Sequence, residues 1–200
     1  MARIGQAETN AGLLRDLLAG PALKPGSRIL IAGAGTGQMF EFLHADFLAF
    51  CEVTCSDVNP LFLERLQSRF ACETVIDDIE DSRLSPGWDA IAVVLVLEHV
   101  AWRAAVRSLS RLKPENLCLI IQRNPANVSA AVTPGRMPPG TMRVFAEQTP
   151  PHLIPEDELV AELGLFGFEL REREVRPVQD GKAMIGLRFG AGAEACTAYG

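Results

Sequence analysis

Three alternating glycines stand in the segment ILIAGAGTGQ, after a short apolar run and before residues with helical spacing. Gly33, Gly35 and Gly37 allow a sharp turn and bring backbone N–H groups close to a ligand. The G-x-G-x-G spacing departs from the dinucleotide pattern G-x-G-x-x-G, because Gln38 stands where that pattern has its third glycine. No Lys-Ser/Thr pair follows, so the loop is not a P-loop. A tight strand–helix turn without a ligand is the simpler alternative.

Two acidic positions follow the loop, each at the end of an expected strand. Asp57 lies twenty positions after Gly37, where a carboxylate can accept both hydrogen bonds of a ribose diol. Asp78, in the pair Asp77-Asp78, is a candidate acceptor for the exocyclic amine of adenine. A helix cap at Asp57 and a solvated acidic turn at Asp78 are the alternatives. Since no basic residue stands in the loop, a nucleoside with a cationic or zwitterionic tail suits the site better than a polyphosphate.

The glycine loop, Asp57 and Asp78 can contact one ligand only if they follow parallel strands whose carboxyl ends lie at the same edge of a sheet. Near-continuous apolar strands alternating with helical segments predict an α/β fold with a mostly parallel sheet covered on both faces. A turn at Gln179–Gly181 indicates an antiparallel hairpin at the C-terminal end. The expected strands are Arg28–Ala32, Glu52–Ser56, Glu73–Ile76, Asp89–Leu97, Leu117–Gln122, Phe168–Val175 and Lys182–Phe189. The expected helices are Thr9–Ala19, capped by Thr9 or Asn10, then Gln38–Phe50, a helix from Pro60, His99–Leu112 and Glu156–Phe166.

The composition is that of a folded, acidic protein. The chain has 200 residues, 48% hydrophobic and 22% charged, with a formal net charge of −6, which excludes a disordered chain and argues against a nucleic-acid partner. The polar start and the longest apolar run, Ala90–Leu97, indicate neither a secretory signal nor a membrane span. The five cysteines have no metal-ligand spacing. We therefore expect a cytoplasmic protein with reduced thiols, no metal site and no membrane partner.

The order of these motifs resembles the class I S-adenosylmethionine-dependent methyltransferases. GAGTG is similar to their first motif, DDIED to the segment whose Asp contacts adenine, and WDAIAVVLVLEHV to their fourth strand. LKPENLCLII is similar to their turn into strand five, and PHLIPEDELVAELGLFGFEL to the helix and strand after the substrate lid of small-molecule members. The resemblance covers roughly residues 28–189 and implies a Rossmann-like three-layer sandwich with a seven-stranded sheet. It also implies S-adenosyl-L-methionine as cofactor and a small-molecule methyl acceptor.

The resemblance assigns roles to residues by position. The glycine loop would hold the methionine part of the cofactor, Asp57 the ribose, and the segments after strands two and three the adenine. The implied cofactor-binding residues are Gly33, Ala34, Gly35, Gly37, Asp57, Val58, Asp78, Ile79, Val94 and Leu95. One departure matters: Ile31 stands where the family commonly has an acid that helps to orient the methionine amino group. That contribution must come from elsewhere or is missing.

The expected organisation is an N-terminal cap helix in residues 1–25, a methyltransferase domain in residues 26–190 and a tail in residues 191–200. A Pro-rich insertion at about residues 124–155 is the expected substrate lid, with His152 in it. His99, just after the fourth strand, is the candidate general base if the acceptor arrives protonated. Ile31 also motivates an alternative function, a non-catalytic nucleoside-binding regulatory protein. A nicotinamide-dependent oxidoreductase is disfavoured by Gln38.

Overall fold

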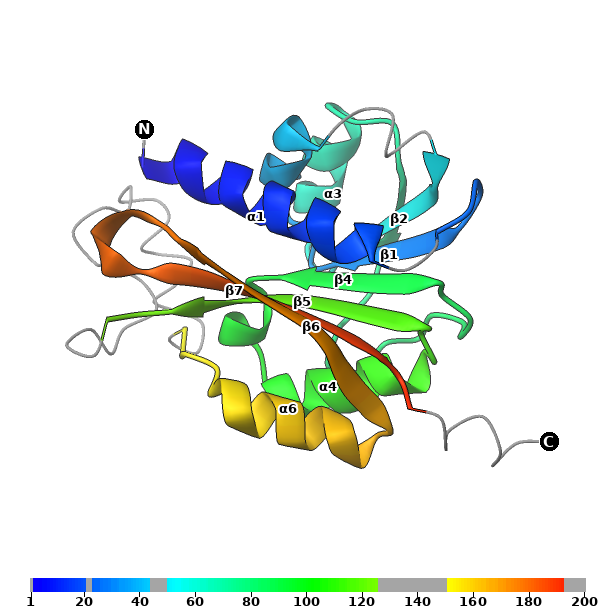
Figure 1. Ribbon diagram of the computed structural model, residues 1–200. Helices are drawn as coiled ribbons and strands as arrows, with labels where there is room; N and C mark the ends of the chain where they lie inside the picture. The colour runs from blue at the N-terminus through cyan, green and yellow to red at the C-terminus, as the bar shows by residue number, and fades with distance from the viewer. Residues whose placement is uncertain (1, 21–22, 44–49, 126–150, 193–200) are drawn as a thin grey trace.

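The computed structural model describes residues 2–20, 23–43, 50–125 and 151–192 (Figure 1). The strands are β1 (Arg28–Ala32), β2 (Glu52–Asp57), β3 (Glu73–Ile76), β4 (Ala90–Val94), β5 (Asn116–Arg123), β6 (Phe168–Pro177) and β7 (Ala183–Ala191). The α-helices are α1 (Ala2–Ala19), α3 (Pro60–Gln67), α4 (Trp102–Arg111) and α6 (Glu156–Leu165). Short 3-10 helices are η1 (Gln38–Phe42), η2 (Leu97–His99) and η4 (Gln179–Gly181).

The described strands form one mixed sheet of seven strands in the order β3-β2-β1-β4-β5-β7-β6. The first five strands are parallel, and β7 pairs antiparallel with both β5 and β6. The turn η4 joins β6 to β7 and has Asp180 at φ 65°. The predicted α/β fold and C-terminal hairpin are confirmed. Because these strands are parallel, the carboxyl ends of β1, β2 and β4 all lie at the same edge of the sheet.

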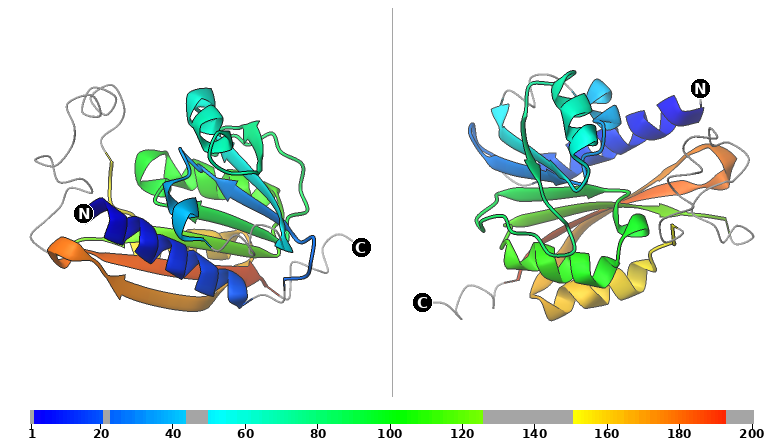
Figure 2. Two further views of the ribbon diagram at one scale, coloured as in Figure 1. Left: turned by 90° about the horizontal axis from the view of Figure 1, so that it is seen from above. Right: turned by 180° about the vertical axis from the view of Figure 1, so that it is seen from behind.

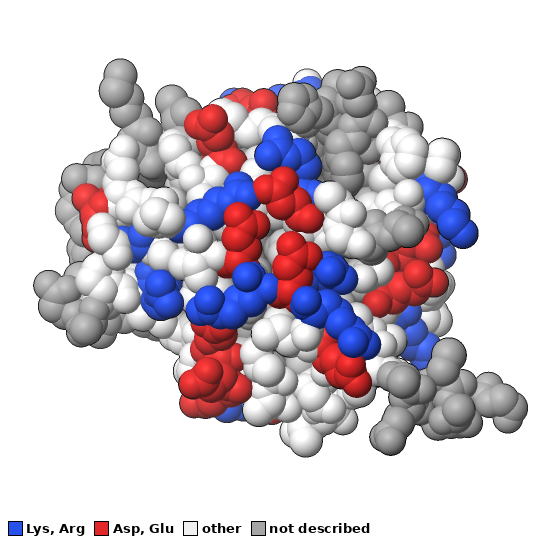
Figure 3. All heavy atoms as spheres, in the orientation of Figure 1, with Lys and Arg blue, Asp and Glu red and all other residues white. Residues whose placement is uncertain are grey.

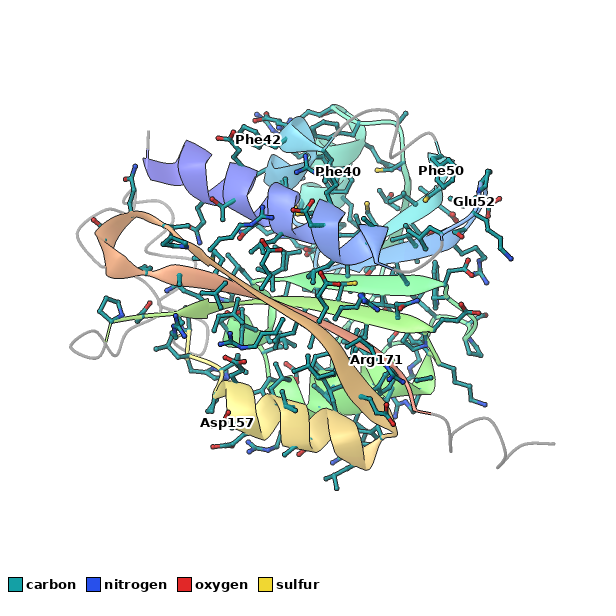
Figure 4. The ribbon with its side chains drawn as sticks, viewed as in Figure 1. Phe40, Phe42, Phe50, Glu52, Asp157 and Arg171 are labelled. Carbon is teal, nitrogen blue, oxygen red and sulfur yellow. The ribbon has the colours of Figure 1, made fainter. Side chains whose placement is uncertain are left out.

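Helices cover both faces of the sheet and make three layers (Figures 1 and 2). In β1, Ile29 and Ile31 belong to the core cluster with α1 and η1, while Leu30 and Ala32 belong to the cluster with α4 and α6. Successive side chains of a strand point to opposite faces, so a strand with hydrophobic residues throughout is buried on both sides. Phe40 and Phe42 of η1 lie on the same side of the sheet as α1 (Figure 4).

Two predicted helices in the N-terminal part of the chain differ from the structure. Helix α1 begins at Ala2, so neither Thr9 nor Asn10 caps it; the Thr9 hydroxyl donates to the Gly5 carbonyl oxygen at 2.7 Å inside the helix. A continuous helix over Gln38–Phe50 is also wrong. The 3-10 helix η1 ends before Leu43, which is extended at φ −84° and ψ 134°. The Leu43 side chain is buried on the α1 side of the core. Tertiary packing of Leu43 overrides the helical spacing of the apolar residues.

The fourth strand is shorter than predicted because its backbone leaves the strand conformation at Leu95. Leu95 has φ 55°, a left-handed conformation that a strand cannot continue. The next residues form η2, and α4 starts only at Trp102. His99 is therefore the last residue of a 3-10 turn rather than the first of a helix, and it stays next to the carboxyl edge of the sheet.

Some predictions concern residues outside the described ranges. Residues 126–150 of the expected lid and 193–200 of the expected tail lie there. The division into cap, domain and tail thus remains a prediction. Among the residues that the structure describes, no helix has the length and apolar character to cross a membrane.

Candidate cofactor site

The glycine loop follows β1 and turns toward the end of β4. Gly33, Gly35 and Gly37 have φ values of 71°, 55° and 75°, a region in which glycine carries no steric penalty. A Cβ on Gly33 would meet Val96 Cγ2 at 2.4 Å, whereas a Cβ on Gly35 would have no atom within 4 Å. The absence of a side chain at Gly33 therefore lets the end of β1 approach Val96, which follows β4. A side chain at Gly35 would instead point into open space.

Asp57, at the end of β2, holds the loop through its carboxylate. Its Oδ2 accepts a hydrogen bond from the Gly35 N–H at 2.9 Å, and its Oδ1 accepts one from the Asn59 N–H at 2.9 Å. The Ala34 N–H donates to the Ser56 carbonyl oxygen at 2.9 Å. A carboxylate has about four lone-pair sites, so Asp57 keeps acceptor capacity for a ligand beside Gly35.

A cavity of about 580 Å³ lies against the loop, between α1 and the ends of β1 and β4. Gly33, Ala34, Gly35, Val94 and Leu95, all predicted from the sequence, line it. Helix α1 contributes Gln6, Ala7 and Asn10, and the remaining wall is Ile31, Ala32, Thr36, Gln38, Met39 and Phe62. A concave, mostly uncharged site at the carboxyl ends of parallel strands is where α/β proteins bind ligands.

The other predicted residues lie outside this wall. Val58, 68% exposed, offers an apolar side chain next to Asp57. Asp78 is exposed, and its Oδ1 accepts the Glu80 N–H at 2.9 Å. Ile79 is buried in the core with α4, so only its backbone can face a ligand. Gly37 is buried and packs against Leu66 and Phe70, which gives it a role in packing η1 against α3.

His99 and His152 come together after β4. The His152 N–H donates to the Glu98 carbonyl oxygen at 2.9 Å, which places His152 next to η2. Loss of water around the ring lowers the pKa of His99, and the neighbouring charge of His152 lowers it further. At neutral pH the His99 imidazole is therefore in the form that accepts a proton. Neither histidine lines the cavity.

Sequence reasoning missed two buried polar side chains near the site. Asn10 is 5% exposed and Glu98 is 3% exposed. Asn10 Oδ1 and Glu98 Oε2 have no hydrogen-bond partner in the described part of the chain. Burial raises the pKa of Glu98 to about 7, against the lowering effect of the Gln122 N–H on its other oxygen. Neither residue carries a signal in the sequence, because only tertiary packing buries a polar side chain of a helix or turn.

Charged side chains on α1, β6 and β7 form ion pairs with each other. On the face shown in Figure 3, basic and acidic side chains are interleaved over β6 and α1. Arg176 pairs there with Asp16 and Glu174, and Arg188 pairs with Glu172. Within the described ranges, no group of three or more histidine, cysteine or acidic side chains is placed to hold a metal ion.

Comparison with known proteins gives a family for the segment that carries the loop. Residues 29–115 match a family model described as a methyltransferase domain. A search of curated protein sequences gives no significant match.

Solved structures share the fold across nearly the whole chain. Magnesium protoporphyrin IX methyltransferase from Synechocystis PCC 6803, crystallised with S-adenosylhomocysteine, has a TM-score of 0.68 at 18% identity, covering 95% of this chain and 85% of that one. The N-methyltransferase NodS from Bradyrhizobium japonicum WM9 has a TM-score of 0.64 at 20% identity, covering 92% and 86%. The [4+2]-cyclase SpnF has a TM-score of 0.64 at 16% identity, covering 90% and 80%. Such identities show the fold alone. Within that shared fold, residues 29–115 are the segment that matches the methyltransferase-domain model.

Proposed function

We propose that the protein transfers a methyl group from S-adenosylmethionine to a small-molecule acceptor. The observation that carries this proposal is the pairing of Asp57 with the Gly35 N–H at 2.9 Å beside an uncharged cavity. The match to a methyltransferase domain supports the reaction class. Two similar structures, a magnesium protoporphyrin IX methyltransferase and an N-methyltransferase, support a small acceptor.

The residues present fit the proposed cofactor. Asp57 has acceptor capacity for the ribose hydroxyls, and the exposed side chain of Val58 offers an apolar surface to the adenine ring. Asp78, at the next strand end, is the proposed acceptor for the adenine amine. Gly35 leaves open space where any other residue would place a Cβ. The methionine part then lies in the cavity, against Gly33, Ala34, Val94 and Leu95.

The bound cofactor supplies an electrophilic methyl group on a sulfonium, and the protein supplies alignment and exclusion of water. Alignment of two reacting groups is itself a large rate factor. Helix α1 closes the cavity on one side with Gln6, Ala7 and Asn10. For an acceptor that arrives protonated, we propose His99 as the base, since its lowered pKa keeps the imidazole neutral.

We expect S-adenosylhomocysteine to raise the melting temperature of the protein, and NADH to leave it unchanged. Ligand at 100 times its dissociation constant stabilises a protein by about 2.7 kcal/mol, which a thermal-shift assay detects. Asp57→Ala should weaken S-adenosylhomocysteine by about 1–3 kcal/mol, the range for hydrogen bonds to a charged group.

Asp89→Ala is the matched control for Asp57→Ala. The Asp89 carboxylate also accepts a backbone N–H, that of Arg28 at 2.7 Å, but it precedes β4 and so lies at the opposite edge of the sheet. This variant should lower the melting temperature and keep the full ligand-induced rise. Stabilisation by NADH and none by S-adenosylhomocysteine would contradict the proposed function.

The two histidines give a second expectation. NMR titration of the imidazole protons should place the pKa of His99 below the ordinary value of about 6.5. In a His152→Ala variant the pKa of His99 should rise, because a positive neighbour is gone, but burial should still hold it below the ordinary value. An unchanged His99 titration in that variant would show that the two rings do not interact.

A further inference from the structure

The side-chain amide of Asn10 is buried in a wall of the cavity with its oxygen unpaired. Asn10 is 5% exposed, lines the cavity, and its Oδ1 has no hydrogen-bond partner in the described residues. Nearly all buried polar atoms in folded proteins are paired, and asparagine is disfavoured inside a helix. An unpaired oxygen in the wall of a cavity offers an acceptor to a ligand with an N–H donor at that point.

The surrounding packing holds this amide in place. Leu14, one helical turn after Asn10, is fully buried in the core. Leu13 and Leu17 pack against Gly186 of β7, where an added Cβ would lie 3.2 and 3.1 Å from their methyl groups. The helix is therefore seated directly on the sheet, which fixes the backbone that carries Asn10.

The cavity wall has no acid to meet a cationic ligand group. None of the described residues lining it is charged, and Ile31, at the end of β1, is 1% exposed in the core under α1. Asp57 lies outside the wall, on the ribose side of Gly35. With the ribose at Asp57, the group that enters the cavity is the amino-acid end of the cofactor. Its N–H donor is the α-ammonium.

We propose that Asn10 Oδ1 accepts a hydrogen bond from the α-ammonium group of S-adenosylmethionine and of its thioether product. This inference rests on the proposed function. A residue of helix α1 thus takes the orienting role that the apolar Ile31 cannot perform. Asn10 acts on binding and on the position of the cofactor, and takes no part in proton transfer.

A binding cycle tests the inference. Isothermal titration calorimetry compares S-adenosylhomocysteine with its deamino analogue, which lacks only the α-amino group, on the wild type and on Asn10→Leu. We expect the wild type to prefer S-adenosylhomocysteine by at least about tenfold, the scale of a hydrogen bond to a charged group. The variant should lose this preference and bind the deamino analogue as the wild type does. Asn10→Ala repeats the cycle with a smaller side chain if the leucine variant does not fold.

Thr9→Ala is the matched control, since the Thr9 hydroxyl is bonded within α1 and the residue does not line this cavity. It should keep the wild-type preference. Equal preference in the wild type and in the Asn10 variants would overturn the inference. A wild type that binds neither compound would instead reject the proposed function, so the two failures are distinguishable. The melting temperature of ligand-free Asn10→Leu should not fall, because the substitution removes an unpaired buried oxygen; a purely structural asparagine would show the opposite.

Discussion

A Gly33→Ala variant should lose about 2–5 kcal/mol of folding stability. At φ 71° an alanine is strained by about 1–2 kcal/mol. Its Cβ would also lie 2.4 Å from Val96 Cγ2 and 2.9 Å from Cγ1. Valine has few rotamers with which to move away, and overpacking of this kind costs about 1–3 kcal/mol. Urea denaturation, with the midpoint and the slope compared with wild type, measures the loss.

Gly35→Ala, two residues further on, provides the comparison. Its φ of 55° carries similar backbone strain, but its Cβ would meet no atom within 4 Å. We therefore expect it to cost only about 1–2 kcal/mol of stability and to weaken S-adenosylhomocysteine, because the added methyl enters the space beside the ligand. If the two substitutions destabilise the protein equally, the contact with Val96 adds nothing to the cost of a side chain at position 33.

Glu98 should make the protein less stable as the pH rises toward neutrality. Burial raises its pKa to about 7 from the ordinary 4.5, so the folded chain holds a proton that the unfolded chain releases. The contribution of protonated Glu98 to the free energy of unfolding is fully present below pH 4.5, and it is lost as the pH rises through 7. The loss is on the order of 3 kcal/mol, since one pKa unit corresponds to about 1.4 kcal/mol.

Glu98→Gln isolates this effect. Glutamine keeps an oxygen for the Gln122 N–H, which Glu98 Oε1 accepts at 2.8 Å, and cannot ionise. The variant and the wild type should be about equally stable near pH 4, and the variant more stable by about 3 kcal/mol near pH 8. Glu80→Gln is the control, since the Glu80 carboxylate also accepts a backbone N–H, that of Ala101, in a less buried place. A parallel pH profile for wild type and Glu98→Gln would contradict the prediction.

The parts of the site that depend on local chemistry could be predicted from the sequence. Apolar strands followed by glycines or acids require a parallel sheet whose carboxyl edge gathers those residues. That topology places Asp57 next to the glycine loop, and the structure adds its hydrogen bond with the Gly35 N–H. The hairpin turn at Gln179–Gly181 likewise depends on a short-range signal, namely its turn residues.

The parts that depend on tertiary packing could not be predicted. Asn10 looked like a helix cap, since nothing in the preceding residues shows that the helix starts at Ala2. Glu98 is an acidic residue in a polar-looking turn of the sequence, and only the packing of η2 against β5 buries its side chain. Leu43 follows a helical spacing yet is extended, because its place in the core outweighs the local preference.

The position of β7 has a consequence for how the chain is made. β7 is the last described strand along the chain, yet it lies between β5 and β6. While a ribosome is still producing the hairpin, β5 presents an open edge whose residues Leu117–Gln122 are all buried in the finished sheet. Unpaired apolar edges invite pairing with other chains. The β5 edge of the nascent sheet can therefore be covered as in the finished sheet only after β7 has been made and has inserted between β5 and β6.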